Sequence, residues 1–327
     1  MKTFRNPVSP FDAPDPFMTW VPETGYYYAL FTRGRVLELF RSRRAAEICT
    51  GGESKILYTA NGARDGIWGD IWAPEMHRGS DGRWYIYTSG RIREERGAPK
   101  RIFILEALSD DPFGDWAFKC IPTPDTASID PTVYTAPDGR QFLCCAREDR
   151  GLVLTIYALE NPWTFGKPGA TISRARYDWE TVPPYTGDSA INEGPFFVEE
   201  KERLYIIYSG NGCWSDHYGF GVLEYIGGDR SDPARMCAPA NWLKHEAPIF
   251  TRGNGVYGPG HASFFRSPDG SELWCAYHGM KKPNVTVSWA PRYFNIQRVY
   301  FDGSGYPVMG EPAGYEKDLT PPSGEPD

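Results

Sequence analysis

One structural unit repeats five times along the chain, and this repetition limits the fold more than any other feature of the sequence. Each unit has an opening segment, a tight turn, an aromatic-rich stretch and a second apolar stretch. The opening segments lie near residues 15, 73, 130, 193 and 261, at intervals of roughly 60 residues. Such a repeat with several strands per unit predicts a β-propeller, whereas a β-sandwich would show no such period. The sequence therefore predicts one all-β domain, a five-bladed propeller spanning residues 1–327.

The turns and strands inside the units carry the usual hairpin signals. Asp-Gly pairs occur at Asp81-Gly82, Asp138-Gly139 and Asp269-Gly270, each between β-branched or aromatic runs. Abundant glycine and proline argue for short strands and against long helices.

Three expectations concern the last part of the chain. The fifth unit should contain strands at 273–278 and 285–289, and the apolar run 294–301 should add an outer strand that helps to close the ring. The tail from about residue 311 is rich in proline and charge, so we expect it to be loosely held.

Charge and cysteine content restrict the partners and the compartment. The net charge of −7 argues against a nucleic-acid or anionic-membrane surface. Seven cysteines without a Cys-x-x-Cys pair indicate reduced, buried thiols and no disulfide framework. The N-terminus lacks the apolar stretch of a signal peptide, and no later run is long enough to cross a bilayer. We expect a cytoplasmic protein, or a secreted one if a signal peptide has been removed.

Three acidic residues stand in the opening segments of separate units. Asp15 and Asp130 precede prolines in the first and third units, and Glu193 lies among the uncharged residues 191–197 of the fourth. Because the innermost strands of a propeller surround one axis, these carboxyl groups should converge on one cavity. An isolated Asp-Pro is a common start of a turn, but three converging carboxylates repel each other unless a site uses them. Glycoside hydrolysis uses such a set, with one protonated acid and one ionised carboxylate.

The acids in their order, together with Trp72-Ala73-Pro74-Glu75, resemble the motifs of glycoside hydrolase family 43, from about Asp15 to Pro307. That family consists of five-bladed propellers acting on arabinan, arabinoxylan and xylan with inversion of the anomeric centre. The resemblance implies that Asp15 is the general base, Asp130 tunes pKa values and orients substrate, and Glu193 is the general acid.

Three further positions gain an expected role from the resemblance. Trp72 would stack on a sugar, although a core tryptophan is the alternative, and Arg292 would contact substrate hydroxyls unless it is a solvated strand end. His261 matches an axial histidine that, in many members, lies near a calcium ion. Calcium prefers oxygen ligands, so His261 would act through coordinating water. No cofactor is expected to be required, and the calcium would be structural.

The substrate is expected to be an oligosaccharide that contains arabinose or xylose. The segments 208–214 and 256–261 resemble the α-L-arabinofuranosidase and exo-arabinanase side of the family, which favours release of arabinofuranose by exo action. A β-D-xylosidase is the main alternative. A phosphorylase is disfavoured because the opening segments lack clustered basic residues. The alternative from another class is a carbohydrate-binding propeller without catalytic activity.

Overall fold

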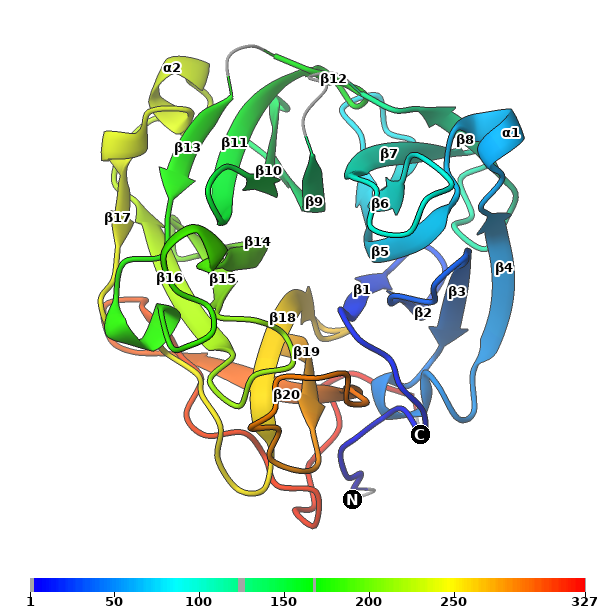
Figure 1. Cartoon of the computed structure of the whole chain (residues 1–327). Coiled ribbons are helices and arrows are strands. Elements are labelled where there is room, and N and C mark those ends of the chain that lie inside the picture. Colours follow the sequence, from blue (N-terminus) through cyan, green and yellow to red (C-terminus); the bar gives the residue numbers. More distant parts are fainter. Residues whose placement is uncertain (1–2, 123–126, 167–168, 327) are drawn as a thin grey trace.

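Five antiparallel sheets surround a central axis, and each sheet forms one blade of a propeller (Figure 1). The computed structural model describes residues 3–122, 127–166 and 169–326. Each blade consists of strands that are consecutive in the sequence, so no blade borrows a strand within the described residues. The predicted all-β, five-bladed propeller is confirmed.

The strands have the following bounds. The first blade contains β1 (Phe17–Val21), β2 (Tyr26–Leu30), β3 (Val36–Ser42) and β4 (Glu53–Thr59). The second contains β5 (Gly69–Arg78), β6 (Trp84–Arg91), β7 (Lys100–Ala107) and β8 (Trp116–Cys120). The third contains β9 (Ser128–Thr135), β10 (Gln141–Glu148), β11 (Leu152–Asn161), β12 (Thr164–Phe165) and β13 (Ala170–Ser173). The fourth contains β14 (Asn192–Glu200), β15 (Arg203–Gly210), β16 (Gly219–Tyr225) and β17 (Trp242–Lys244). The fifth contains β18 (Tyr257–Arg266), β19 (Leu273–Met280), β20 (Tyr293–Phe301) and β21 (Pro307–Val308).

Helices in the described residues are short and lie between strands. They are α1 (Gly62–Asp65), α2 (Pro233–Met236) and the 3-10 turns η1 (Ala45–Glu47), η2 (Asp178–Glu180), η3 (Gly187–Ser189) and η4 (Pro239–Asn241). Across the same residues, we find no helix with the length and apolar character that a bilayer crossing would require.

The second strand of a blade is buried on both of its faces. All eight residues of β19 are buried, and β6 and β15 are buried in all but one position. Neighbouring blades cover both faces of these strands, which explains why they read as continuous apolar runs. The outer strands β4 and β8 are only partly covered. The core therefore lies between the blades.

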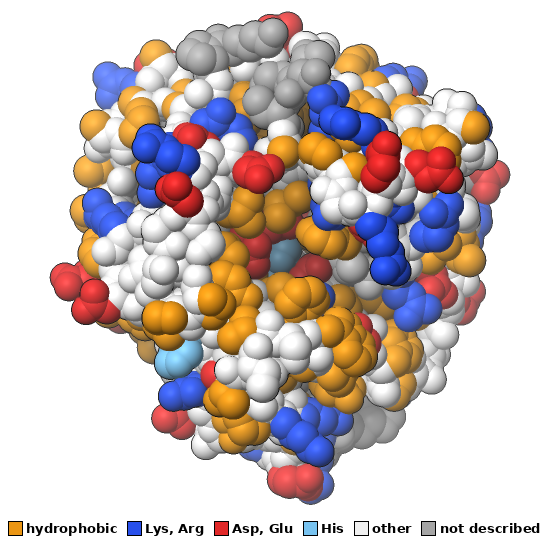
Figure 2. Space-filling model, viewed as in Figure 1, with side chains coloured by type: hydrophobic (Ala, Val, Ile, Leu, Met, Phe, Trp, Pro, Cys, Tyr) orange, Lys and Arg blue, Asp and Glu red, His pale blue; other side chains and the backbone are white. Residues whose placement is uncertain are grey.

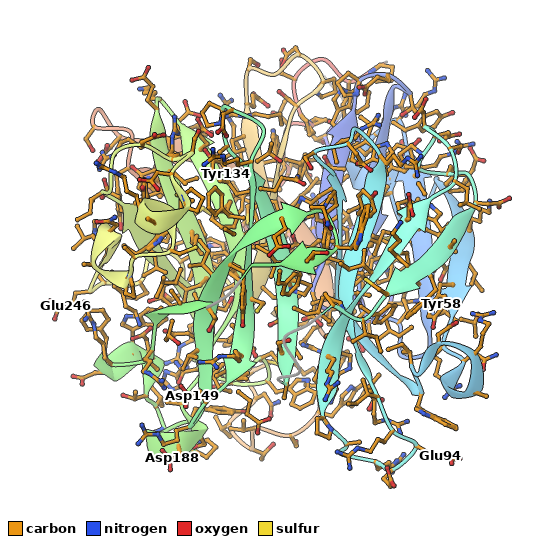
Figure 3. The ribbon with its side chains drawn as sticks, turned by 90° about the horizontal axis from the view of Figure 1, so that it is seen from above. Tyr58, Glu94, Tyr134, Asp149, Asp188 and Glu246 are labelled. Carbon is orange, nitrogen blue, oxygen red and sulfur yellow. The ribbon has the colours of Figure 1, made fainter. Side chains whose placement is uncertain are left out.

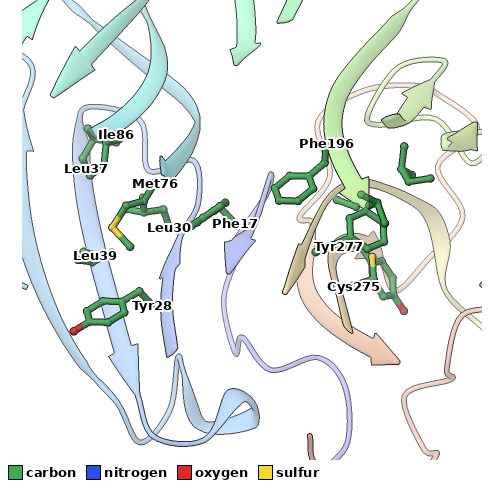
Figure 4. Close-up of a cluster of buried hydrophobic side chains, with 14 of the residues drawn as sticks. Phe17, Tyr28, Leu30, Leu37, Leu39, Met76, Ile86, Phe196, Cys275 and Tyr277 are labelled. Atoms are coloured by element: carbon green, nitrogen blue, oxygen red, sulfur yellow. The ribbon is translucent and has the colours of Figure 1, made fainter. Parts of the chain in front are cut away.

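Aromatic rings fill the centre of the propeller. Phe17 of β1 lies 5.6 Å from the ring of His77 of β5 and 6.4 Å from Phe196 of β14, measured between centroids. Phe196 in turn lies 5.8 Å from Phe264 of β18. Figure 4 shows Phe17 and Phe196 pointing toward one another across the axis. Four blades thus contribute rings to one packed layer at the axis.

The inner strands β1, β5, β9, β14 and β18 begin on the same side of the disc, which we call the opening face. Since consecutive strands are antiparallel, the β6–β7, β10–β11 and β13–β14 connections lie on this face as well. Figure 3 places Glu94, Asp149 and Asp188 from these three connections at one end of the molecule. The residues at the start of the inner strands are therefore accessible only from this side, above the aromatic layer.

The N-terminal segment joins the first blade to the fifth. The Asn6 side chain exchanges two hydrogen bonds with the backbone of Ile296, and the Val8 amide donates to the Phe294 carbonyl at 2.8 Å. The run 294–301 thus takes part in ring closure as expected, but as the third strand of its blade. The prediction of a strand at 285–289 was wrong, because these residues lie in the β19–β20 connection.

The C-terminal tail is fastened to the blades, contrary to the expected loose tail. Leu319 pairs with Phe4 through two backbone hydrogen bonds of 2.8 and 3.0 Å. The Ala313 amide donates to Gln297, and the Ala45 amide donates to the Glu325 carboxylate. These bonds fix the tail against both terminal blades despite its proline content.

Candidate active site

A left-handed backbone conformation marks the start of every inner strand. The equivalent positions and their φ angles are Asp15 (56°), Ala73 (44°), Asp130 (56°), Gly194 (54°) and His261 (49°). In the second to fifth blades the strand pairing also shifts register at this point. Such bulges redirect side chains, and strained backbone is concentrated at functional sites. Here they turn side chains from separate blades toward the axis.

Glu193 is displaced by one residue from the position of the two aspartates. Asp15 and Asp130 directly precede proline, whereas in the fourth blade Gly194 holds that place. Glu193 instead aligns with Trp72 of the second blade. Glu193 therefore does not occupy the repeat position of Asp15 and Asp130, although all three acids line the same cavity.

That cavity has a volume of about 130 Å³ and opens on the opening face. Its walls include all six residues singled out in the sequence: Asp15, Trp72, Asp130, Glu193, His261 and Arg292. They also include Thr32, Ile129, Cys213 and Trp214, which the sequence reasoning missed. Figure 2 shows acidic side chains and a histidine at the floor of the central hollow, with hydrophobic side chains at its rim.

Asp15 is held as a carboxylate. Thr32 donates a hydrogen bond of 2.7 Å to its Oδ2, and Nη1 of Arg292 donates one of 3.2 Å to its Oδ1. Burial opposes ionisation, but Arg292, His261 and His278 together outweigh it, so the pKa of Asp15 lies well below its ordinary value. The Asp15 amide donates to Nδ1 of His278 at 3.1 Å, and burial lowers the pKa of His278 to about 4. His278 is therefore a neutral support for Asp15 at pH 7.

Glu193 has the opposite character. Burial raises the pKa of Glu193 to about 7, and the negative charge of Asp15 acts in the same direction. The Tyr218 hydroxyl donates a hydrogen bond of 2.9 Å to Oε1 and opposes this rise. Glu193 can thus carry a proton near neutral pH while Asp15 remains ionised. Two carboxyl groups whose pKa values are driven apart are suited to separate acid and base roles.

Asp130 lies beside both of these acids. Its Oδ2 accepts a hydrogen bond of 3.0 Å from the Gly194 amide, next to Glu193. Burial, with the charges of Glu193 and Asp15, raises the pKa of Asp130 well above its ordinary value. Nδ1 of His261 lies 3.5 Å from Oδ1 of Asp15 and 4.0 Å from Oδ2 of Asp130. Asp130 and His261 thus connect the surroundings of the two other acids.

Trp72 and Arg292 present groups suited to a sugar. Nζ of Lys100 lies 3.6 Å from the centroid of the Trp72 ring, so only the other face of this ring is open to a ligand. The Arg292 guanidinium lies 5.4 Å from the Trp214 ring, and its Nε is buried without a hydrogen-bond partner in the described structure. The alternative of a solvated strand end is excluded for Arg292, whose side chain is 10% exposed.

A buried polar network holds the residue before Glu193. Oε1 of Glu180 accepts hydrogen bonds from Asn192 and Tyr208, each at 2.8 Å, and lies 2.6 Å from Nζ of Lys244. Oδ1 of Asn192 accepts from Ser173 and from Lys244. Since Glu180 and Asn192 are fully buried, these bonds fix the backbone that carries Glu193.

The expected calcium ion has no obvious set of protein ligands. Within residues 3–122, 127–166 and 169–326, no group of three or more His, Cys, Asp or Glu side chains is arranged to hold a metal ion. The His261 amide donates to Ser209 at 2.8 Å, which fixes the backbone next to the ring. A water-mediated role of His261 toward a metal stays a prediction.

Comparison with known proteins gives a consistent family assignment. An α-L-arabinofuranosidase of Humicola insolens is 33% identical over 258 residues, which cover 75% of this chain and 50% of that protein. An extracellular exo-α-(1→5)-L-arabinofuranosidase of Streptomyces avermitilis is 30% identical over 324 residues, which cover 95% of this chain and 64% of that protein. The chain thus spans half to two thirds of the length of these relatives.

Solved structures support the fold. The crystal structure of an α-L-arabinofuranosidase from Lactobacillus brevis superposes with a TM-score of 0.84 at 24% identity, covering 96% of this chain and 98% of that one. The profile of the glycosyl hydrolases family 43 matches residues 4–307. This chain belongs to glycosyl hydrolase family 43.

Proposed function

We propose that this chain is an inverting α-L-arabinofuranosidase that releases terminal arabinofuranose from oligosaccharides derived from arabinan or arabinoxylan. The observation that carries the proposal is the contrast between Asp15 and Glu193 in one small cavity. Arg292 keeps Asp15 ionised, whereas burial raises the pKa of Glu193 to about 7. Glycoside hydrolysis by single displacement needs one carboxylate and one carboxylic acid of this kind.

In the proposed reaction, Glu193 donates its proton to the glycosidic oxygen as the bond to the anomeric carbon breaks. A water molecule attacks that carbon from the opposite face and transfers a proton to Asp15. Asp130 tunes the pKa of Glu193 from its place beside the Gly194 amide, and Arg292 orients sugar hydroxyls. Solvent returns a proton to Glu193 and removes one from Asp15, which completes the cycle.

The preference for arabinose and for exo action has two supports. The two relatives are named as arabinofuranosidases, and the Streptomyces avermitilis protein is named as an exo enzyme. The cavity is small, and the aromatic layer of Phe17, Phe196 and Phe264 lies farther along the inner strands. A site of this shape suits one terminal sugar better than the middle of a chain.

Hydrolysis of matched aryl glycosides tests the proposal. We expect the wild type to cleave an aryl α-L-arabinofuranoside in preference to an aryl β-D-xyloside. Glu193→Ala should lose about 10²–10⁴-fold in kcat on a poor leaving group and much less on an activated one, because only the former needs protonation. Glu199→Gln, a partly exposed glutamate of the same strand, serves as the matched control.

The other outcomes separate the alternatives. Cleavage of the xyloside alone would make the chain a β-D-xylosidase and would retain the acid. No cleavage of aryl glycosides or arabino-oligosaccharides, together with oligosaccharide binding, would favour the carbohydrate-binding propeller. Proton NMR of the first product formed distinguishes inversion from retention.

Two expectations from the sequence remain to be tested separately. If a structural calcium ion binds near His261, addition of calcium should raise the melting temperature of the protein, and chelation should lower it. The cytoplasmic location needs cell fractionation, since the Streptomyces avermitilis relative is named as extracellular.

A further inference from the structure

A second cavity adjoins the active-site cavity on the opening face. It has a volume of about 250 Å³, and Trp72 and Ile129 line both cavities. Its other walls come from the β6–β7 connection, the start of β9 and the residues that flank the β10–β11 turn. A ligand held at the acids can therefore continue past Trp72 into the space between the second and third blades.

Lys100 supplies an uncommitted hydrogen-bond donor in this second cavity. Its Nζ lies over the Trp72 ring, and within the described residues it has neither a hydrogen-bond acceptor nor an ion-pair partner. Burial lowers the pKa of Lys100, but Asp70 and Glu148 counteract this effect. A half-buried ammonium group has three N–H donors, and a cation–π contact satisfies none of them as a hydrogen bond.

The charges of the cavity indicate which ligand it fits. Lys100 is accompanied by the carboxylate of Glu148, and Ile129 and Leu152 supply apolar surface. A site for a phosphate or a uronic acid would be expected to gather cations, and Glu148 would repel such an anion. A neutral sugar has hydroxyls that both donate and accept, as well as an apolar C–H face. The lining therefore matches an uncharged sugar.

We propose that this second cavity binds the neutral sugar on the leaving-group side of the scissile bond, and that Lys100 recognises a hydroxyl of that sugar. The proposal rests on the proposed function, because it names the second sugar of the same substrate. It makes Lys100 a specificity residue for oligosaccharides. Hydrolysis of a substrate with a minimal leaving group should not depend on it.

The test compares two substrates of the full chain. One is a (1→5)-linked arabinofuranosyl disaccharide, and the other is α-L-arabinofuranosyl fluoride, whose leaving group is too small to reach the second cavity. For Lys100→Met, kcat/KM on the disaccharide should fall about 10–100-fold, the range for losing a charged hydrogen bond, while kcat/KM on the fluoride stays close to that of the wild type. Lys119→Met is the matched control. Lys119 lies on β8, the outer strand of the second blade, and its Nζ also lies over a tryptophan ring, 3.9 Å from the centroid of Trp163.

The outcomes are distinct. An equal effect of Lys100→Met on both substrates, or no effect on either, would overturn the second sugar site. If Lys100→Met does not fold, Glu148→Gln is the second variant, because Glu148 lines the same cavity and is exposed. This variant should weaken hydrolysis of the disaccharide and leave hydrolysis of the fluoride unchanged. A wild type that cleaves neither substrate would instead contradict the proposed function itself.

Discussion

The Tyr218 hydroxyl donates a 2.9 Å hydrogen bond to Oε1 of Glu193. The Tyr218 ring stacks on His278 with an interplanar angle of 6° and a centroid separation of 5.5 Å. His278 accepts the hydrogen bond of the Asp15 amide. A continuous set of contacts thus joins the proposed acid of the fourth blade to the proposed base of the first. The relative positions of the two carboxyl groups therefore depend on buried residues that do not react.

Removal of the Tyr218 hydroxyl should shift the pH profile of the enzyme. In Tyr218→Phe, ionised Glu193 loses a hydrogen bond, so its pKa should rise above about 7 by roughly one to two units. A general acid works only while protonated, so the alkaline limb of kcat/KM should move to higher pH. Tyr205→Phe is the control, because this buried hydroxyl bonds to the Gly305 carbonyl far from the cavity. An unchanged alkaline limb would contradict the assignment of Glu193 as the acid.

Loss of the Arg292 charge should shift the acidic limb of the pH profile of kcat/KM. Burial favours the protonated form of Asp15, and Arg292 is the largest influence against it. In Arg292→Gln the pKa of Asp15 should therefore rise, and the acidic limb of kcat/KM should move to higher pH because the base must be ionised. Arg298→Gln, on the strand β20 that follows Arg292 and paired with Glu272 at the surface, should keep the wild-type profile. Equal profiles for both variants would exclude Asp15 as the base.

The Glu180–Lys244 pair should matter for stability as well as for activity. Glu180→Gln leaves a buried ammonium without its carboxylate, which should cost about 3–5 kcal/mol in the free energy of unfolding. Burial raises the pKa of Glu180, but Lys244 and the backbone amides of Arg176 and Tyr177 together outweigh this effect, so the pKa in the folded state lies below its ordinary 4.5. The stabilisation is therefore complete above pH 4.5 and decreases as the pH falls through the folded-state pKa.

Denaturant unfolding across the acidic range measures both effects. Glu53→Gln, which removes an exposed ion pair with Arg41, should change stability by less than about 1 kcal/mol. The double variant Glu180→Gln with Lys244→Met should recover part of the loss, since no charge remains buried. If the double variant is as unstable as the single one, the pair does not act through its charges.

The sequence predicted the propeller because its repeat reflects a physical requirement of each blade. Every blade needs a strand buried on both faces, and that requirement produced the apolar runs that recur along the chain. The Asp-Gly pairs located hairpins in the same way, because a tight turn has to join neighbouring strands of a blade. The strand at 285–289 was predicted wrongly because Val285 and Trp289 imitate a strand pattern, although both side chains are largely exposed in a connection.

The site was predicted in part. The acids were visible because carboxylates are rare in apolar opening segments. The bulges and left-handed residues that turn them toward the axis became visible only in the structure. Tyr218 and His278 could not be identified, since both resemble ordinary residues of buried strands. Their importance arises from contacts between blades, which a single sequence does not reveal.

A glycine next to His261 offers a test of how closely Tyr218 must be held. A Cβ atom at Gly260 would lie 1.9 Å from the Tyr218 ring, so Gly260→Ala must displace the ring that bonds to Glu193. We expect a loss of about 1–3 kcal/mol in stability, as for overpacked cores, and a fall in kcat on substrates with poor leaving groups. Gly303→Ala is the matched control, because a Cβ atom there meets no atom within 4 Å. Thermal unfolding and kinetics of both variants decide the matter: wild-type kinetics in a folded Gly260→Ala protein would show that Glu193 does not depend on the position of Tyr218.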